Sequence, residues 1–394
     1  MPRHLPPAYS PVSFGAIAAA TVFGRKASRA TLERALCRRF DAEHVTLTGS
    51  GTQALQLAIT MATEGGHAVA LPAYSCFDLV SAVVGAGAPV CFYDIDPRTL
   101  TPASDSLEQC LIQGARAVVA GNLYGFPLPW DELRRIAAPH GAVLIEDAAQ
   151  GLGSSLDGTA AGLAGDLTIL SFGRGKGWTG GGGGALLVGG GPRPDAAPLD
   201  DAGGRTRPSL VSTAAWLLGR PALYGFPASV PQLGLGQTIY HDPVPPSKIS
   251  VFSAELAART EDAAFEVMPE RRKCANRWAD AIRAVDPSEQ SVRLCSPLRA
   301  LESASCLRLP VRLKNPSSSE DHWKKLRRFG VESGYPRALP ELDQVKPLVT
   351  NSHERFPGAD TLASELVTLP THHWVRDADI EGALALITGQ PPTP

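Results

Sequence analysis

Residues 167–188 read LTILSFGRGKGWTGGGGGALLV, and this stretch decides the fold. The apolar runs 167–170 and 185–188 predict two strands, and the loop of small residues between them carries Lys176. A lysine framed by glycines at a strand end can act as a nucleophilic amine where water exclusion or a neighbouring cation lowers its pKa. The same pattern is also typical of a solvated lysine in a flexible turn, so other segments must decide between the two interpretations.

An alternation of strands and helices surrounds this stretch, from about residue 28 to residue 190. Further apolar runs predict strands at 45–48, 68–71, 89–95, 115–120 and 142–145, with helical patterns between several of them. Near-continuous apolar strands that alternate with helices favour a mostly parallel sheet with helices on both faces. Ligands of such sheets bind beyond the carboxyl ends of the strands. The sequence therefore predicts an α/β fold with its site at that edge.

The rest of the chain has a different character. Residues 189–208 and 225–247 are rich in Gly and Pro, and we interpret the first as a mobile surface loop and the end of the second as a domain junction. Residues 213–218 predict a helix, and residues 249–286 predict a long helix that is interrupted at Pro269. We therefore predict a large domain over 1–247, which includes the N-terminal segment and the mobile loop, and a small α+β domain over 248–394.

Composition excludes several classes of protein. The 394 residues are 44% hydrophobic, which suffices for a large core, and the net charge of −2 comes without a basic stripe for nucleic acid. The apolar runs are shorter than the roughly 20 residues that cross a bilayer, and we interpret residues 17–20 as part of a mature N-terminal segment and not as a signal peptide. Seven cysteines without a C-x-x-C pair indicate reduced thiols in a cytosolic protein without a metal site.

Two more strand ends carry polar residues that suit a ligand. Residues 48–55 read TGSGTQAL, a glycine turn before a helix, where free N–H groups and the hydroxyls of Ser50 and Thr52 can bind an anion; we expect Thr52 to cap the helix. Residues 142–150 read AVLIEDAAQ, which places Glu146 or Asp147 at the carboxyl edge of a buried strand. An ordinary helix cap is the alternative for both segments. An anion site, a carboxylate and a lysine together match the needs of pyridoxal phosphate.

In order and spacing, these segments resemble the DegT/DnrJ/EryC1/StrS family of pyridoxal-phosphate enzymes, best known as nucleotide-sugar aminotransferases. The resemblance extends over most of the chain. The matching segments are SGTQAL at 50–55, PAYS at 72–75, GAPV at 87–90, DID at 94–96, LYG at 123–125, EDAAQ at 146–150, SFGRGK at 171–176 and LPTH at 369–372. The resemblance implies a pyridoxal-phosphate-dependent transferase of fold type I, which is aspartate-aminotransferase-like, and a homodimer in the cytoplasm.

The resemblance also implies roles for single residues. Lys176 would bind the cofactor aldehyde and shuttle a proton, and Asp147 would pair with the ring nitrogen. Gln150 would lie near the ring hydroxyl. The phosphate would be held by Ser50, Gly51, Thr52 and Ser171. Three further residues flank this site, namely Asn122, Arg174 and Trp178.

The chain departs from the family pattern at three places. Cys76 stands where the family has an aromatic ring over the cofactor, so Tyr74 or Phe77 stacks instead, or both only pack in the core. The Asn-x-Arg segment that reaches the phosphate across the dimer is absent, and Gln237 and Lys248 are candidate substitutes. The glutamate of the usual Gly-Glu-Gly-Gly segment is a glycine in this chain.

The expected activity is an aminotransferase with a ping-pong Schiff-base mechanism. It would transfer an amino group from glutamate to a keto-sugar, nucleotide-linked, in surface-polysaccharide or secondary-metabolite synthesis. Two alternatives remain: the same cofactor with a non-sugar ketone or amine, such as a cyclitol or an amino acid, and a non-catalytic relative that binds a ligand. Sugar dehydratases of the family replace the lysine with histidine, so Lys176 disfavours that chemistry.

Overall fold

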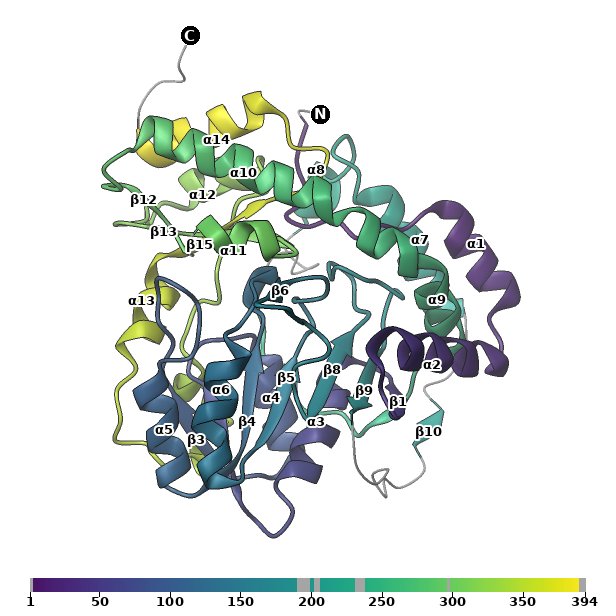
Figure 1. Cartoon of the computed structure of the whole chain (residues 1–394). Helices are drawn as coiled ribbons and strands as arrows, with labels where there is room; N and C mark the ends of the chain where they lie inside the picture. The colour runs from purple at the N-terminus through teal and green to yellow at the C-terminus, as the bar shows by residue number, and fades with distance from the viewer. Residues whose placement is uncertain (1–2, 190–198, 202–205, 231–237, 296–297, 390–394) are drawn as a thin grey trace.

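The computed structural model describes residues 3–189, 199–201, 206–230, 238–295 and 298–389 (Figure 1). A mixed sheet, nine-stranded within this part of the chain, forms the lower half of the molecule in the order β10-β11-β1-β9-β8-β5-β4-β2-β3. Its strands are β1 His44–Thr48, β2 Ala68–Pro72, β3 Val90–Tyr93, β4 Ala115–Gly121, β5 Val143–Asp147, β8 Leu167–Ser171, β9 Gly184–Val188, β10 Asp200–Asp201 and β11 Ser247–Lys248. The predicted strands are therefore all present, with shifts of one or two residues at their ends.

Strands β3, β2, β4, β5 and β8 run parallel, whereas β9 is antiparallel to both of its neighbours, β8 and β1. Helices cover both faces of the sheet, with α5 and α6 on one face and α3 and α4 on the other (Figure 1). The helices that accompany these strands are α2 Lys26–Phe40, α3 Gly51–Ala62, α4 Asp78–Ala86, α5 Ser104–Ile112 and α6 Trp130–Ala137. The expected α/β architecture is confirmed.

Two of the helix predictions need correction at their ends. Ser50, and not Thr52, is the N-cap of α3: its backbone is extended, and its Oγ accepts a hydrogen bond from Gln53 N at 3.2 Å. The helix expected near 213–218 begins earlier, as α7 Thr206–Leu218, and α8 Gly225–Ala228 follows it. The break expected at Pro269 is confirmed, because α9 Val251–Glu266 ends just before α10 Met268–Val285 and Pro269 lies in the first turn of α10.

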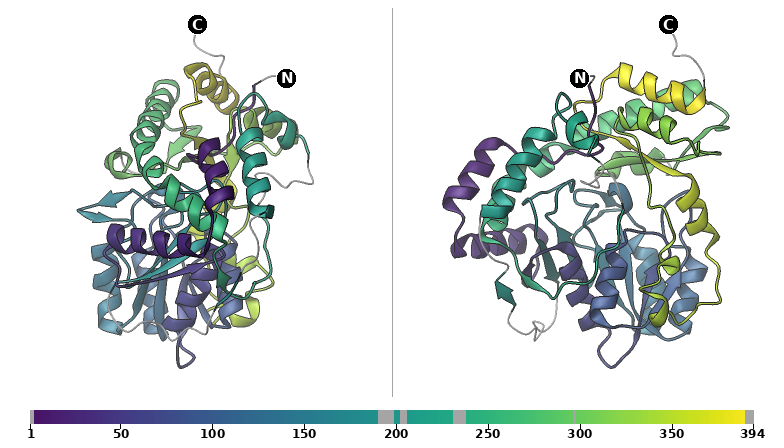
Figure 2. Two further views of the ribbon diagram at one scale, coloured as in Figure 1. Left: turned by 90° about the vertical axis from the view of Figure 1, so that its right-hand side faces the viewer. Right: turned by 180° about the vertical axis from the view of Figure 1, so that it is seen from behind.

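The loop predicted at 189–208 lies mostly outside the described residues, which include only 189, 199–201 and 206–208 of it. A helix that the sequence did not predict, α1 Phe14–Phe23, begins at the N-cap Ser13 and lies beside α7 and α9 (Figure 2). No helix in the described part of the chain combines the length and the apolarity that a membrane-crossing segment needs.

The C-terminal part is built on a second sheet, in the order β12-β13-β15-β14, with α10 and α14 packed against each other. Its elements are β12 Val292–Leu294, α11 Leu298–Ser303, β13 Arg308–Leu313, α12 Glu320–Arg327, β14 Glu332–Ser333, α13 Pro357–Glu365, β15 Leu366–Pro370 and α14 Asp377–Thr388. The chain also forms the hairpin β6 Ser155–Leu156 and β7 Thr159–Ala160, and 3-10 turns at Leu123–Gly125, Ala138–His140, Leu339–Glu341 and Lys346–Leu348.

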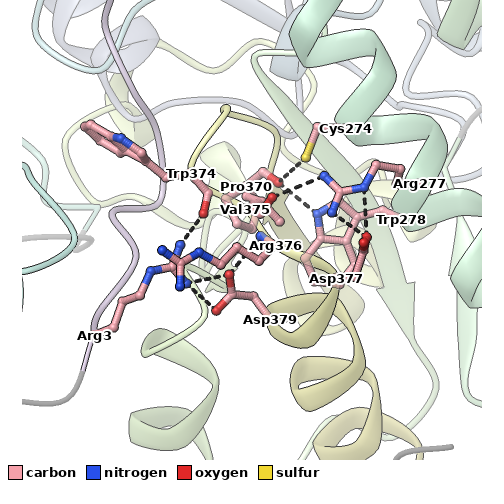
Figure 3. Close-up of polar contacts among 10 residues, drawn as sticks. All are labelled: Arg3, Cys274, Arg277, Trp278, Pro370, Trp374, Val375, Arg376, Asp377 and Asp379. Atoms are coloured by element: carbon pink, nitrogen blue, oxygen red, sulfur yellow. Dashed lines mark hydrogen bonds and ion pairs between the residues drawn. The ribbon is translucent and has the colours of Figure 1, made fainter.

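The start of the chain packs on the C-terminal part, although the sequence assigned it to the large domain. Arg3 binds the carboxylate of Asp379 and the carbonyl oxygen of Trp374, and Trp278 of α10 donates to Pro370 O nearby (Figure 3). Leu5 N donates to Arg328 O at 2.9 Å. The N-terminal segment therefore links the two parts, and the boundary near residue 247 stays a prediction.

Candidate active site

The start of α3 lies beside the end of β8. A Cβ added to Gly51 would come within 2.8 Å of Ser171 Cβ, so only glycine allows this approach. The N–H groups of Gly51 and Thr52 belong to the first helical turn and have no acceptor within the helix. Together with the hydroxyls of Thr52 and Ser171, and with the positive end of the helix dipole, they could bind an anion.

Two anchors hold the loop that carries Lys176. On one side Ser10 Oγ accepts a hydrogen bond from Gly175 N and donates one to Lys176 O, both at 3.0 Å. On the other side Trp178 Nε1 donates to Ala257 O at 2.8 Å, and its ring is buried. The Lys176 side chain is half-buried. Ser10 is a contact that the sequence gave no reason to expect, because it comes from a distant segment.

The two acids of β5 point to opposite faces, as neighbours on a strand must. Glu146 is fully buried and accepts hydrogen bonds from Gly162 N, Ala164 N and Thr168 Oγ1 at 2.9, 3.0 and 3.2 Å. Burial raises its pKa, and these bonds oppose the rise. Glu146 is therefore a structural acid that holds the loop before β8, and the choice that the sequence left open falls on Asp147.

Asp147 lines a cavity that Lys176 also lines. Ala149 N donates to its Oδ1 at 3.0 Å within a turn, and the described chain passes from β5 to β6 without a helix, so the expected alternative of a helix cap is wrong. Burial raises the pKa of Asp147, and the positive charge of Lys176 opposes the rise. A cation bound in the cavity would stabilise the ionised carboxylate further.

One cavity collects most of the residues proposed for the cofactor: Gly51, Thr52, Cys76, Asp147, Gln150, Ser171 and Lys176. Three proposed residues lie outside its lining. Ser50 does not line the cavity, and its Oγ accepts the capping hydrogen bond from Gln53 N of α3. Tyr74 is fully buried, and its hydroxyl accepts a hydrogen bond from Tyr335 N at 2.9 Å. Phe77 is buried at the start of α4, so neither aromatic reaches the cavity, and Cys76 does.

Burial and the negative charge of Asp78 raise the pKa of Cys76 to about 12. The thiol is therefore neutral at physiological pH and acts as a small apolar wall. A ring placed next to it would meet a sulfur atom in place of the usual aromatic face.

Gln150 connects the cavity to the C-terminal part. Its Oε1 accepts from Tyr124 N and its Nε2 donates to Tyr335 Oη, both at 3.0 Å. The rings of Tyr124 and Tyr335 are stacked with centroids 6.0 Å apart. Both ends of the Gln150 amide are thus already engaged. Sequence reasoning missed Tyr335, because no local pattern distinguishes it from any other tyrosine.

A second, larger cavity of about 1300 Å³ lies between the N-terminal segment, the Lys176 loop and α7. Arg174 and Arg220 line it, and Asp78 lines both cavities. The larger cavity therefore adjoins the smaller one that Lys176 lines. Of the two expected substitutes for the missing cross-dimer contact, Lys248 is exposed on β11 and Gln237 lies outside the described residues.

Comparison with known proteins agrees with this geometry. Residues 18–192 match the model of the DegT/DnrJ/EryC1/StrS aminotransferase family. A dTDP-4-dehydro-2,3,6-trideoxy-D-glucose 4-aminotransferase from Saccharopolyspora spinosa is 36% identical over 34% of this chain and 34% of its own length. An L-glutamine:2-deoxy-scyllo-inosose aminotransferase from Streptomyces kanamyceticus is 36% identical over 36% of this chain and 35% of its own. The chain thus spans about a third of the length of the curated relatives that it matches.

The structural similarity extends over a larger part of the chain than the sequence similarity does. A putative sugar aminotransferase from Streptococcus pneumoniae, solved in its PLP form, superposes with a TM-score of 0.72 over 99% of this chain and 98% of its own, at 19% identity. That likeness confirms the fold over nearly the whole length of the chain. Within residues 18–192, the chain is therefore similar to the DegT/DnrJ/EryC1/StrS aminotransferase family.

Proposed function

We propose that the chain is a pyridoxal-phosphate-dependent aminotransferase that transfers an amino group from glutamate to a nucleotide-linked keto-sugar. One observation carries this proposal: Lys176, Asp147 and the anion site at Gly51 and Ser171 all line the same cavity. The names of the relatives support the reaction type, and the sugar nucleotide in the name of the first relative supports the substrate class.

The residues around the cavity fit pyridoxal phosphate. The phosphate would bind to the N–H groups of Gly51 and Thr52 and to the hydroxyl of Ser171, where the missing side chain of Gly51 leaves room. Asp147 would bind the ring nitrogen and Lys176 the aldehyde. In addition, the buried Oδ1 of Asn122, which lines the same cavity, has no hydrogen-bond donor among the described residues.

When bound, pyridoxal phosphate supplies an electron-withdrawing ring that stabilises negative charge on the substrate carbon. The residues of the chain control where protons reside. The carboxylate of Asp147 holds a proton on the ring nitrogen, because an ion pair in a buried site favours both charged forms. The Nζ atom of Lys176 moves a proton to and from the substrate carbon as a general base and acid. Ser10 and Trp178 keep the lysine loop in place.

One observation favours a second substrate class. The relative from Streptomyces kanamyceticus is named for 2-deoxy-scyllo-inosose, which is a cyclitol ketone, and for L-glutamine as donor. The adjoining cavity is large enough for either substrate. The two candidates are distinguished by offering each ketone with each donor and measuring the mass of the product.

The decisive experiment is spectroscopic. We expect the purified protein to turn yellow with pyridoxal phosphate and to bleach with borohydride, with the label on Lys176. In a separate sample that has not been reduced, glutamate should convert the bound cofactor and release 2-oxoglutarate in an amount equal to the enzyme. A colourless protein with no cofactor affinity would instead support a ligand-binding relative without catalysis.

We also propose a cytoplasmic homodimer that serves surface-polysaccharide or secondary-metabolite synthesis. All seven cysteines are free, which suits a reducing compartment. Large exposed apolar side chains gather on α1, α7 and α8 and on the turn before α8, where a second copy would cover them; they are Phe14, Val22, Phe23, Leu210, Leu217, Leu223 and Phe226. Sedimentation analysis of the holoenzyme measures the oligomeric state directly.

A further inference from the structure

Asn122 is a buried cavity residue that the proposed reaction does not yet use. It follows β4 directly, is 2% exposed, and borders the same cavity as Asp147 and Lys176. Its backbone N–H donates to Asp147 O at 3.2 Å, which fixes it beside that acid.

The orientation of its amide group is fixed. Asn122 Nδ2 donates to Phe126 O at 3.2 Å, and a flip of the amide would place two oxygens together. Gly151 packs against the same group: a Cβ there would lie 2.3 Å from Asn122 Cβ and 2.6 Å from Oδ1. Only a glycine at position 151 therefore leaves space for this amide.

Despite this fixed position, Oδ1 accepts no hydrogen bond from any described residue. A buried acceptor without a donor is costly, and such groups are rare in folded proteins. Gln150 Nε2 donates to Tyr335 Oη and makes no hydrogen bond to Asn122 Oδ1. Oδ1 is therefore available to accept a hydrogen bond from a group bound in the cavity.

We propose that Asn122 is a positioning residue whose Oδ1 accepts a hydrogen bond from an O–H or N–H donor of the group held in the cavity. This inference rests on the proposed function and assigns a further contact to the same site. Two sources have the required chemistry: the ring hydroxyl of the cofactor and the ammonium of the amino donor. In both cases the bond forms only on binding, so it contributes to affinity and not to the stability of the empty protein.

The test compares Asn122→Leu, which removes the amide, with Asn122→Gln, which keeps an amide with both its donor and its acceptor. The matched control is Asn351→Leu. Asn351 is equally buried, but both ends of its amide are satisfied, by Phe92 N at 3.0 Å and Phe92 O at 2.8 Å. Thermal unfolding of the cofactor-free proteins, titration with pyridoxal phosphate, and the KM for glutamate in the half-reaction are measured for each.

We expect Asn351→Leu to lower the Tm more than Asn122→Leu does, because Asn122→Leu loses only the bond to Phe126 O and also removes an unpaired acceptor. If the cofactor is the donor, Asn122→Leu weakens pyridoxal phosphate binding about tenfold and Asn122→Gln restores part of it. If the amino donor is the source, cofactor affinity stays constant and the KM for glutamate rises about tenfold.

Wild-type affinities in Asn122→Leu, for both ligands, would overturn the assignment while leaving the proposed function intact. A large loss of Tm in Asn122→Leu, equal to that of Asn351→Leu and without any change in affinity of the folded fraction, would show a purely structural residue and overturn it as well. A wild-type protein that binds no pyridoxal phosphate would reject both proposals together.

Discussion

Replacing Gly184 by alanine tests how the sheet supports the anion site. Gly184 is the first residue of β9 and pairs with Thr48 on one side and Ser171 on the other. A Cβ there would lie 2.5 Å from Gly51 N and 2.5 Å from Ser50 C. Both are backbone atoms, so no side chain can rotate away, and the start of α3 must retreat by roughly 1 Å to reach normal contact.

The expected cost follows from this geometry. Overpacking of this kind lowers the free energy of unfolding by about 1–3 kcal/mol. The displaced N–H groups at the start of α3 would also hold the phosphate less well, and the loss of one charge-assisted hydrogen bond weakens pyridoxal phosphate binding by about ten- to a hundredfold. We expect both effects in Gly184→Ala, measured by urea unfolding of the cofactor-free protein and by cofactor titration.

Gly189→Ala is the matched control, because it lies just past the other end of β9 and has nothing within 4 Å of the added Cβ. We expect that variant to be as stable as the wild type, or slightly more stable through a less flexible unfolded chain. The reasoning is refuted if Gly184→Ala matches Gly189→Ala in both stability and cofactor affinity. A loss of stability with unchanged cofactor affinity would instead show that the phosphate does not bind at the start of α3.

Further changes test single residues. Lys176→Ala should abolish turnover and the borohydride-fixed cofactor link while circular dichroism shows an intact fold; a labelled variant would contradict this. Asp147→Asn should lose most activity. Burial raises the pKa of Asp147, so ionisation of this carboxyl lowers the stability of the cofactor-free wild type as pH rises from the ordinary aspartate range through the raised pKa. The Asp147→Asn variant lacks this titration and should therefore gain stability relative to wild type as pH rises. A stability difference that does not change with pH would contradict this expectation. With a pKa of about 12, Cys76 should react with iodoacetamide at pH 8 roughly a thousandfold more slowly than an ordinary cysteine, as mass spectrometry can follow, and rapid labelling would contradict its burial. Glu146→Leu should destabilise the fold by about 3 kcal/mol or more, because three donors lose their acceptor, and an unchanged urea midpoint would disprove that role.

The sequence predicted the elements that depend on local pattern. Apolar runs located the strands of the large sheet, and the glycine turn before α3 indicated an anion site, because both signals lie within a few residues. Where competing signals were equally local, the sequence could not decide. Glu146 and Asp147 are adjacent carboxylates at one strand end, and their side chains point to opposite faces of the sheet. Only the folded structure shows which of these faces borders the cavity.

Contacts across the chain account for the features that were missed. Ser10 holds the Lys176 loop from the N-terminal segment, and Tyr335 reaches Gln150 from the C-terminal part. The expected ring stackers, Tyr74 and Phe77, flank the residue that lines the cavity but do not line it themselves. Their neighbour Cys76 takes that place because the chain turns sharply between β2 and α4.

The sequence by itself determined the fold class and the residue types of the site, since hydrophobic periodicity and glycine placement are local and leave few ways to pair the strands. Tertiary structure alone decided which carboxylate faces Lys176, which wall is sulfur and not aromatic, and which buried amide awaits a donor. These outcomes depend on distances between segments that are far apart in the chain, and such distances are set by packing, which no local pattern encodes.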